Sequence, residues 1–456
     1  MRMKKIIPGG FREILTIAVP LVITNSAFTV MQFCDRIFLA RYDDLAIQAA
    51  LPAGILSFAL MCLFIAIGGY SGTLVAQYFG AGERLKCVHS TVQGIYFNLL
   101  CLPIFIALIP VGYWLLDSFG HPPELVVQER MYFAWMMFSA VPVGLGWAIS
   151  GFFTGRSRVR LNTVSNVIGC VVNIVLDYAL IFGKLGLPEM GLKGAAIATC
   201  IASCVSPTIQ LGFMLRSKIV RELGYRKAFA PDWPIMGKLI RFGFPSGVQV
   251  MLDVGAFAFF VMMTARLDSV SLTASNVALS INSLAFSPLM GFGAAASIKS
   301  GQYKGAGEFD YAMKSGWSSL KLGLCYMAII GSVFVLLPET LLSLFVSQGE
   351  TGLDRVAFLR TGTMLMYLMT IWGIFDTATI VLIGALKGVG DTRFVMIYLS
   401  LMAWFFWIPG ELLIFKLGGG IVHAWILLAF YISVLSFGFA RRWHGGKWMA
   451  IQVIDA

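Results

Sequence analysis

The chain has 456 residues, of which 58% are hydrophobic and only 12% are charged. A soluble protein of this length would have about 25% charged residues, so the composition excludes a soluble enzyme or a soluble binding domain. The formal net charge of +11 could indicate a nucleic-acid partner, but the positions of the basic residues give it a different cause, described below.

Apolar runs of about 20 residues are long enough to cross the bilayer core as helices. Charge clusters separate twelve such runs, which occupy most of the chain and leave no room for a soluble domain. We therefore predict an all-α membrane protein with twelve transmembrane helices, since the alternating pattern of a membrane β-barrel is absent. The predicted spans are 14–40, 47–75, 93–116, 131–154, 162–182, 193–215, 239–265, 272–298, 315–338, 361–386, 394–415 and 419–440.

The first span contains two ionisable residues, Asp35 and Arg36. An ionisable side chain inside a lipid-spanning segment costs a few kcal/mol or more, so its presence indicates a function. The alternative is a structural role, in which Asp35 pairs with Arg36 or with a backbone group near the helix end. Adjacent side chains point about 100° apart on a helix, which disfavours the direct pair.

The chain contains an internal duplication. The sequence QYFGAGE at 77–83 recurs as QYKGAGE at 302–308, a shift of 225 residues. Later in each half, GFFTG at 151–155 aligns with GALKG at 384–388, a shift of 233 residues. An eight-residue insertion in an outer loop around 345–360 would explain the difference.

Each half contains six predicted spans, an even number, so both halves enter the membrane in the same orientation. The two halves are therefore parallel repeats related by a pseudo-two-fold axis along the membrane normal. We predict an N-terminal six-helix lobe at 1–215, a basic connector at 216–238 and a C-terminal six-helix lobe at 239–456. Two such lobes around a central cleft are the architecture of a transporter.

Basic residues are distributed unequally between the loops on the two sides of the membrane. With the N-terminus inside, the cytoplasmic side receives Lys and Arg in excess over the outer side by about three to one, counted from the sequence. This bias places both termini and the connector 216–238 in the cytoplasm. It also accounts for the net charge, so we expect no nucleic-acid partner.

The N-terminal half carries a set of oxygen-bearing side chains at one predicted depth. Asp35 and Asp177 lie five residues before the outer ends of their spans, and Thr199 lies six residues into the next span. A rise of about 1.5 Å per residue places all three roughly 8–9 Å below the outer boundary. Asn173 lies one helical turn from Asp177. Such an all-oxygen set suits a hard cation such as Na⁺, and a proton could replace the metal ion.

The C-terminal half carries two acids at greater depth, Asp253 and Asp376. Both lie roughly 16–18 Å from the cytoplasmic boundary, near the midplane, where a buried charge needs a cation or a polar partner. The alternative is that they are polar groups of helix packing. In the alignment of the two repeats, Phe260 corresponds to Asp35 and Phe28 corresponds to Asp253. The acids are therefore not requirements of the duplicated scaffold.

The two Q-Y-x-G-A-G-E loops, the AVPL…D pattern of the first span, the basic connector and the six-plus-six plan resemble the multidrug and toxic compound extrusion (MATE) family. The resemblance implies cation-coupled export of bulky, often cationic organic compounds by alternating access. It also implies a cation site at the positions of Asp35, Asn173, Asp177 and Thr199, as in DinF-like members. Asp253 and Asp376 match acidic positions that bind ions or substrate in NorM-like members, although Glu is usual where Asp253 stands.

We therefore expect a monomeric secondary antiporter, coupled to H⁺ or Na⁺, that exports organic cations through a cell inner membrane. If Na⁺ is the coupling ion, Asp35 and Asp177 are its expected ligands, and no other cofactor is expected. A lipid-linked saccharide flippase of the same superfamily is the alternative, but it would need several basic side chains lining the cleft. An intramembrane enzyme such as a polyprenyl transferase would need a D-D-x-x-D cluster, and the only acidic doublet, Asp43 with Asp44, lies outside.

Overall fold

The computed structural model describes residues 7–264, 268–345 and 355–454. The predicted insertion around 345–360 falls partly on residues 346–354, which lie outside the described residues.

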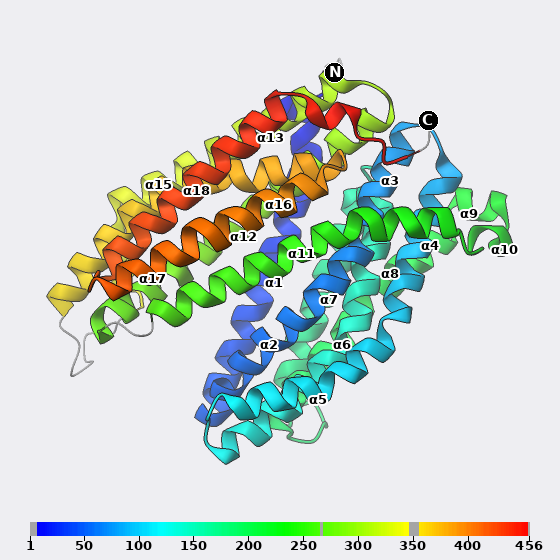
Figure 1. Ribbon diagram of the computed structural model, residues 1–456. Coiled ribbons are helices and arrows are strands. Elements are labelled where there is room, and N and C mark those ends of the chain that lie inside the picture. Colours follow the sequence, from blue (N-terminus) through cyan, green and yellow to red (C-terminus); the bar gives the residue numbers. More distant parts are fainter. Residues whose placement is uncertain (1–6, 265–267, 346–354, 455–456) are drawn as a thin grey trace, which may run out of the picture. The chain divides into compact units, whose positions relative to one another are not determined.

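Within these ranges, twelve helical stretches, some made of two or three consecutive helices, are long and apolar enough to cross a membrane, which confirms the predicted fold class (Figure 1). The elements are α1 Phe11–Tyr42, α2 Asp44–Gly69, α3 Ser71–Gly80, α4 Arg84–Leu100, α5 Leu102–Ser118, α6 Pro123–Thr154, α7 Val159–Ile181, α8 Gly191–Leu215, α9 Lys218–Leu223, α10 Tyr225–Ala228, α11 Trp233–Thr264, α12 Ser269–Gly305, α13 Phe309–Leu336, α14 Pro338–Ser343, α15 Arg355–Gly388, α16 Thr392–Met402, η1 Ala403–Trp407, α17 Ile408–Lys416, α18 Ile421–His444 and η2 Lys447–Ala450.

Some spans are interrupted helices. Cys101 separates α4 from α5, and Pro103 is the second residue of α5. Proline has no backbone N–H and its ring clashes with the preceding turn, so a break at this point is expected. The predicted span 93–116 therefore covers the end of one helix and most of the next.

The eleventh span contains a π-helical segment, η1, between α16 and α17. A π-helical turn takes up an extra residue compared with an α-helical turn. Pro409 follows at the start of α17, where its missing N–H disturbs the hydrogen-bond ladder least. The register of this span is consequently shifted relative to an uninterrupted helix.

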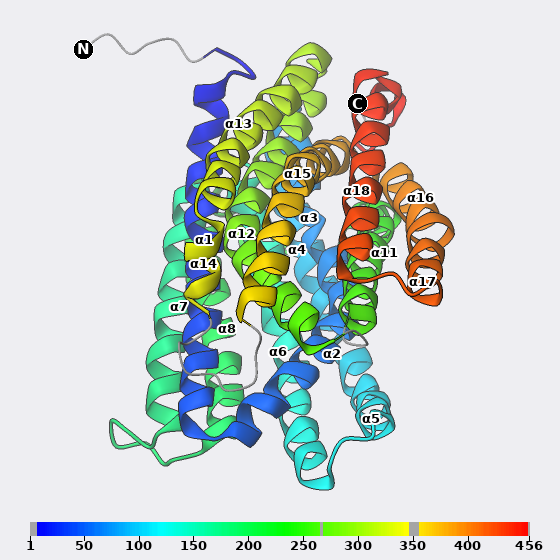
Figure 2. The ribbon, with the colours of Figure 1, turned by 90° about the vertical axis from the view of Figure 1, so that its left-hand side faces the viewer.

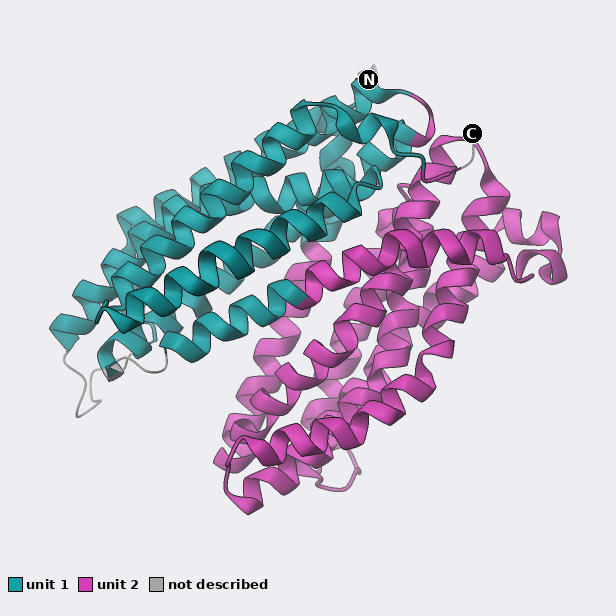
Figure 3. Ribbon diagram, viewed as in Figure 1, with its two compact units in different colours: residues 1–22, 252–304, 308–452 teal, residues 23–251, 305–307, 453–456 magenta. Residues whose placement is uncertain are grey.

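The chain forms two compact units (Figure 3). Unit 1 comprises residues 1–22, 252–304 and 308–452, and unit 2 comprises residues 23–251, 305–307 and 453–456. Two helices, α1 and α11, contribute to both units, because each changes unit partway along its length.

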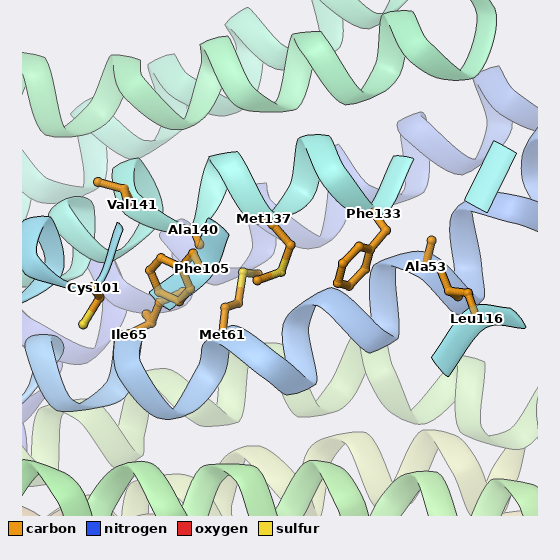
Figure 4. Close-up of a cluster of buried hydrophobic side chains, with 10 residues drawn as sticks. All are labelled: Ala53, Met61, Ile65, Cys101, Phe105, Leu116, Phe133, Met137, Ala140 and Val141. Carbon is orange, nitrogen blue, oxygen red and sulfur yellow. The ribbon is translucent and has the colours of Figure 1, made fainter. Parts of the chain in front are cut away.

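The core of unit 2 is an apolar cluster between α2, α5 and α6 (Figure 4). Met61 of α2 and Met137 of α6 point toward each other, and Phe105 and Phe133 are fully buried beside them. Gly112 of α5 packs directly on the Phe133 ring, which leaves no space for a side chain. On the other side of the unit, α7 and α8 run side by side (Figure 2).

Unit 1 is built around α15, which packs along α13 and α18. Aromatic side chains fill its interior: Trp372 meets Trp425 with ring centroids 5.7 Å apart, and Phe260 contacts Trp407 and Trp425. Edge-to-face aromatic pairs add about 0.5–1.5 kcal/mol each beyond their buried area.

The loop after each QY motif has the same geometry in the two halves. Gly82 and Gly307 both have positive φ angles, 79° and 76°, which glycine adopts without strain. The backbone N–H of Glu83 donates to the carbonyl of Tyr78 at 2.9 Å, and that of Glu308 donates to Tyr303 at 2.8 Å. The local structure therefore agrees with the duplication seen in the sequence.

Candidate functional site

The candidate site in unit 2 joins α1 and α7. Asp177 and Asn173, one turn apart on α7, are 0% and 1% exposed, and Asp35 of α1 is half-buried. With its nitrogen toward them, the Asn173 amide donates to Asp35 Oδ1 at 3.1 Å and to Asp177 Oδ2 at 3.2 Å. The structure thus brings together three of the four residues predicted for this site.

The two carboxyl groups also contact each other directly. Asp177 Oδ1 is buried and has no hydrogen-bond partner among the residues that the structure describes. Two ionised carboxylates in contact repel, and a buried carboxylate oxygen without a partner carries a desolvation cost. A proton or a cation between Asp35 and Asp177 would remove both penalties.

The structural alternative for Asp35 was an ion pair with Arg36. The Arg36 side chain is exposed, and among the described residues no ion pair within 4.0 Å joins it to Asp35. Arg36 acts on Asp35 only as a neighbouring charge. The contacts of Asp35 are therefore made mainly across to α7.

Thr199 has a weaker connection to the site. It is half-buried on α8, the helix that packs along α7, but in the described part of the chain no hydrogen bond links it to either carboxylate. Tyr132 of α6, which the sequence did not single out, lies within electrostatic range of both Asp35 and Asp177. A tyrosine in an aromatic-rich membrane helix gives no signal that would separate it from core residues.

A polar network continues along α7 and α8 from this site. The Gln210 amide nitrogen donates to Asn162 Oδ1 at 3.2 Å and to Ser206 Oγ at 2.9 Å. Ser206 in turn donates to Asn166 Oδ1 at 2.9 Å. Asn162, Asn166, Asn173 and Asp177 recur at intervals of four or seven residues, which places them on one face of the helix. That periodic pattern was present in the sequence.

In unit 1, Asp253 of α11 lies within electrostatic range of Asp376 on α15, so these two predicted residues are also brought together. Two further groups near Asp253 are Lys387, close to the end of α15, and Tyr431 of α18. Lys387 is half-buried. The local charge of this cluster is thus mixed, with two carboxylates against one lysine.

Unit 1 also contains a carboxyl group that the sequence analysis missed. Glu411 of α17 is 0% exposed, and in the described part of the chain neither of its oxygens has a hydrogen-bond partner. The extra residue of η1 changes the repeat offset from 233 to 234, and with this offset Glu411 aligns with Asp177 and Trp407 with Asn173. Phe260 takes the position of Asp35 and packs on Trp407, with ring centroids 6.3 Å apart. The C-terminal half therefore retains one carboxyl and replaces its two partners with aromatic rings.

Twelve apolar spans among the described residues, duplicated halves and buried carboxyl groups within those spans are typical of a multi-pass membrane transporter. The sequence profile of the MatE family matches residues 20–179 and 245–412. The chain belongs to the MatE family, which confirms the family expected from the sequence motifs.

Curated relatives cover nearly the whole chain. The "Probable multidrug resistance protein NorM" of Mesorhizobium japonicum is 28% identical over 440 residues, which are 95% of this chain and 93% of the relative. The protein of the same name from Pseudomonas putida is 28% identical over 443 residues, which are 94% of each chain.

Solved structures share the fold. One, titled as an outward-facing multidrug resistance MATE family transporter of the MOP superfamily, has a TM-score of 0.85 at 16% identity and covers 98% of this chain and 100% of its own. The eukaryotic MATE transporter AtDTX14 has a TM-score of 0.82 at 22% identity and covers 96% of each chain.

Proposed function

We propose that this protein is a cation-coupled antiporter that exports small organic compounds, preferentially cationic ones, by alternating access. The observation that carries the proposal is the buried contact between Asp35, Asn173 and Asp177, which needs a proton or a cation to balance its charge. The multidrug resistance names of the NorM relatives support a range of organic substrates.

The Asn173 amide gives the site two arrangements. With its nitrogen toward the carboxylates, it donates two hydrogen bonds and stabilises them without a metal ion. Rotated by about 180°, it would offer an oxygen to a cation held between Asp35 and Asp177, which is the donor type that Na⁺ prefers. Binding of H⁺ or Na⁺ would then change the contacts between α1 and α7, and this change is the proposed coupling step.

We assign cargo binding to unit 1, where Asp253 and Asp376 lie within electrostatic range of each other. A fixed carboxylate in a low-dielectric interior offsets the desolvation of a cationic compound more than one in water would. The same cluster contains Lys387, which is partly balanced by the two acids, so the net charge still favours cations over the anionic cargo of a lipid-linked saccharide flippase. We place the protein in a cell inner membrane as a monomer, with both termini in the cytoplasm.

Efflux of a fluorescent organic cation from proteoliposomes, with pH and Na⁺ gradients imposed separately, tests the proposal. Asp35→Asn and Asp177→Asn should each abolish gradient-driven efflux, because they remove an ion ligand without changing side-chain volume. Asp43→Asn, at an exposed acid just beyond α1, is the matched control and should keep wild-type efflux. Near-normal coupled efflux by Asp35→Asn would eliminate it as the coupling residue.

A further inference from the structure

Unit 2 contains a cavity of about 420 Å³ at the end of the helices where α6 turns into α7. Four basic side chains line it, from three separate segments: Arg84 at the start of α4, Arg156 and Arg158 in the α6–α7 turn, and Lys218 at the start of α9. The charge bias of the sequence predicts that this end faces the cytoplasm. None of these residues belongs to the transport site proposed above.

Arg156 is the least exposed of the four, with 8% of its surface accessible. Its guanidinium lies 4.4 Å above the centre of the Phe152 ring, and its buried Nη1 has no hydrogen-bond partner within residues 7–264, 268–345 and 355–454. Burial, followed by repulsion from Arg158, lowers the pKa of Arg156. A buried cationic group with an unused donor is unfavourable unless an anion completes its interactions.

Among the described residues, one carboxylate, that of Glu222, lines the cavity, and it does not supply that anion. Glu222 is exposed and lies 3.5 Å from Lys218, one helical turn away on α9. Within the described ranges, no ion pair joins Arg156 or Arg158 to an acid. Among the described residues, Arg156 and Arg158 therefore lack a carboxylate counterion, whereas Lys218 has Glu222.

The repeat provides an internal comparison. The turn 155–160 corresponds to 388–393, and the two turns share their geometry: Arg158 N donates to Phe153 O, and Asp391 N donates to Leu386 O, both at 2.8 Å. In the C-terminal half, however, Val389 replaces Arg156 and Asp391 replaces Arg158.

In the C-terminal turn, a protein side chain neutralises the charge of Asp391, and other protein side chains occupy the space beside the turn. Arg442 donates to the Asp391 carboxylate at 2.7 Å through Nε. Lys304 Nζ donates to the carbonyls of Val389 and Trp448 at 2.7 and 2.8 Å, and the Trp448 side chain is fully buried there. The same scaffold therefore does not require the arginines or the cavity found in the N-terminal half.

We propose that the Arg84–Arg156–Arg158–Lys218 cavity binds a phosphate-type oxyanion, either the headgroup phosphate of an acidic phospholipid or a free phosphate. Guanidinium groups bind phosphate oxygens through paired, charge-assisted hydrogen bonds, and Arg156 provides the buried anchor. The cytoplasmic leaflet of a membrane is rich in anionic lipid headgroups, which adds electrostatic attraction at this end of the helices.

Titration of the purified full-length protein with inorganic phosphate, followed by calorimetry at low ionic strength, tests the site. Wild-type protein should bind phosphate saturably, and Arg156→Gln should weaken binding about tenfold or more, since a charge-assisted hydrogen bond contributes at least that factor. Arg160→Gln, which removes an exposed arginine two residues beyond the cavity, is the matched control and should change the affinity less than about twofold.

A double variant tests the site independently in case Arg156→Gln does not fold. Arg158 and Lys218 are exposed, so the double variant Arg158→Gln/Lys218→Gln should fold normally. Its affinity for phosphate should nevertheless be lower than that of the Arg160→Gln variant.

Nanodiscs distinguish the two anion sources. Preferential retention of phosphatidylglycerol over phosphatidylcholine that is lost in Arg156→Gln identifies a lipid headgroup. Phosphate binding without lipid preference identifies a free anion. Absence of saturable phosphate binding together with absence of lipid preference, or equal losses in Arg160→Gln, would overturn the proposal.

Discussion

Glu411 is a buried carboxyl group that finds no hydrogen-bond partner among the described residues, and an unsatisfied buried polar group typically costs about 1–3 kcal/mol. We expect Glu411→Met to raise the apparent melting temperature of the purified protein by a few degrees, because an unbranched apolar side chain fills the site without that cost. Thermal unfolding measured by intrinsic fluorescence checks this. A lower melting temperature, or loss of efflux in the variant, would mean that the carboxyl binds a proton or an ion.

Asp376 gives a second prediction at the scale of single residues. Asp376→Asn should weaken binding of a cationic dye more than binding of a neutral one, because it removes charge but keeps shape. The Na⁺ and pH dependence of dye binding should change less in this variant than in Asp35→Asn. If Asp376→Asn instead removes the competition between dye and cation while Asp35→Asn retains it, the roles assigned to the two clusters must be exchanged.

The acids of the candidate site were predictable because a carboxylate in an apolar span is rare and its depth can be counted along the helix. Asp35 and Asp177 could be placed at one level for this reason, and Asn173 followed from helical periodicity. Tyr132 could not be predicted, since its proximity to the acids depends on how α6 packs. Glu411 had the same sequence signal as Asp35, but the π-helical offset hid its relation to Asp177.

Helix packing in unit 2 depends on close approach between glycines. A Cβ atom added at Gly151 of α6 would lie 2.6 Å from the Cα of Gly72 on α3, and one at Gly155 would lie 2.7 Å from the Gly72 carbonyl oxygen. Backbones that approach this closely leave room only for the hydrogen atom that glycine carries in place of a side chain. The sequence predicted these spans, but the pairing of α3 with α6 required the structure.

Gly151→Ala should therefore destabilise the protein by about 1–3 kcal/mol through overpacking. Gly212→Ala is the matched control, because Gly212 lies inside α8 and an added Cβ meets nothing within 4 Å. There the better helix propensity of alanine should leave stability unchanged or raise it by up to about 1 kcal/mol. Thermal unfolding of both variants in one detergent compares them directly, and equal melting temperatures would refute the packing argument.

At the scale of the whole molecule, the twelve spans were predictable because span length and loop charge follow directly from bilayer thickness and the insertion bias. The duplication was predictable because QYFGAGE at 77–83 recurs as QYKGAGE at 302–308. The division of the chain into these two units was not predictable, because α1 and α11 each contribute residues to both units. A boundary inside a continuous helix has no composition signal.

The predicted topology can be tested in intact cells after replacement of the eight native cysteines. A cysteine introduced at Arg226, in the connector, should not react with a membrane-impermeant reagent added from outside. A cysteine at Leu185, which is 73% exposed in the loop after α7, is the control and should react. Reaction at position 226 from outside would refute the assigned orientation.

The membership of residues 1–22 in unit 1 has a consequence for synthesis. Glu13 forms an ion pair of 2.8 Å with Lys299 and accepts a hydrogen bond of 2.7 Å from Tyr303. The ribosome makes Glu13 long before it makes either partner. The start of α1 therefore has to remain in the membrane without these partners, while the rest of the same helix can already pack in unit 2. The packing of unit 1 can be completed only after most of the chain has been synthesised.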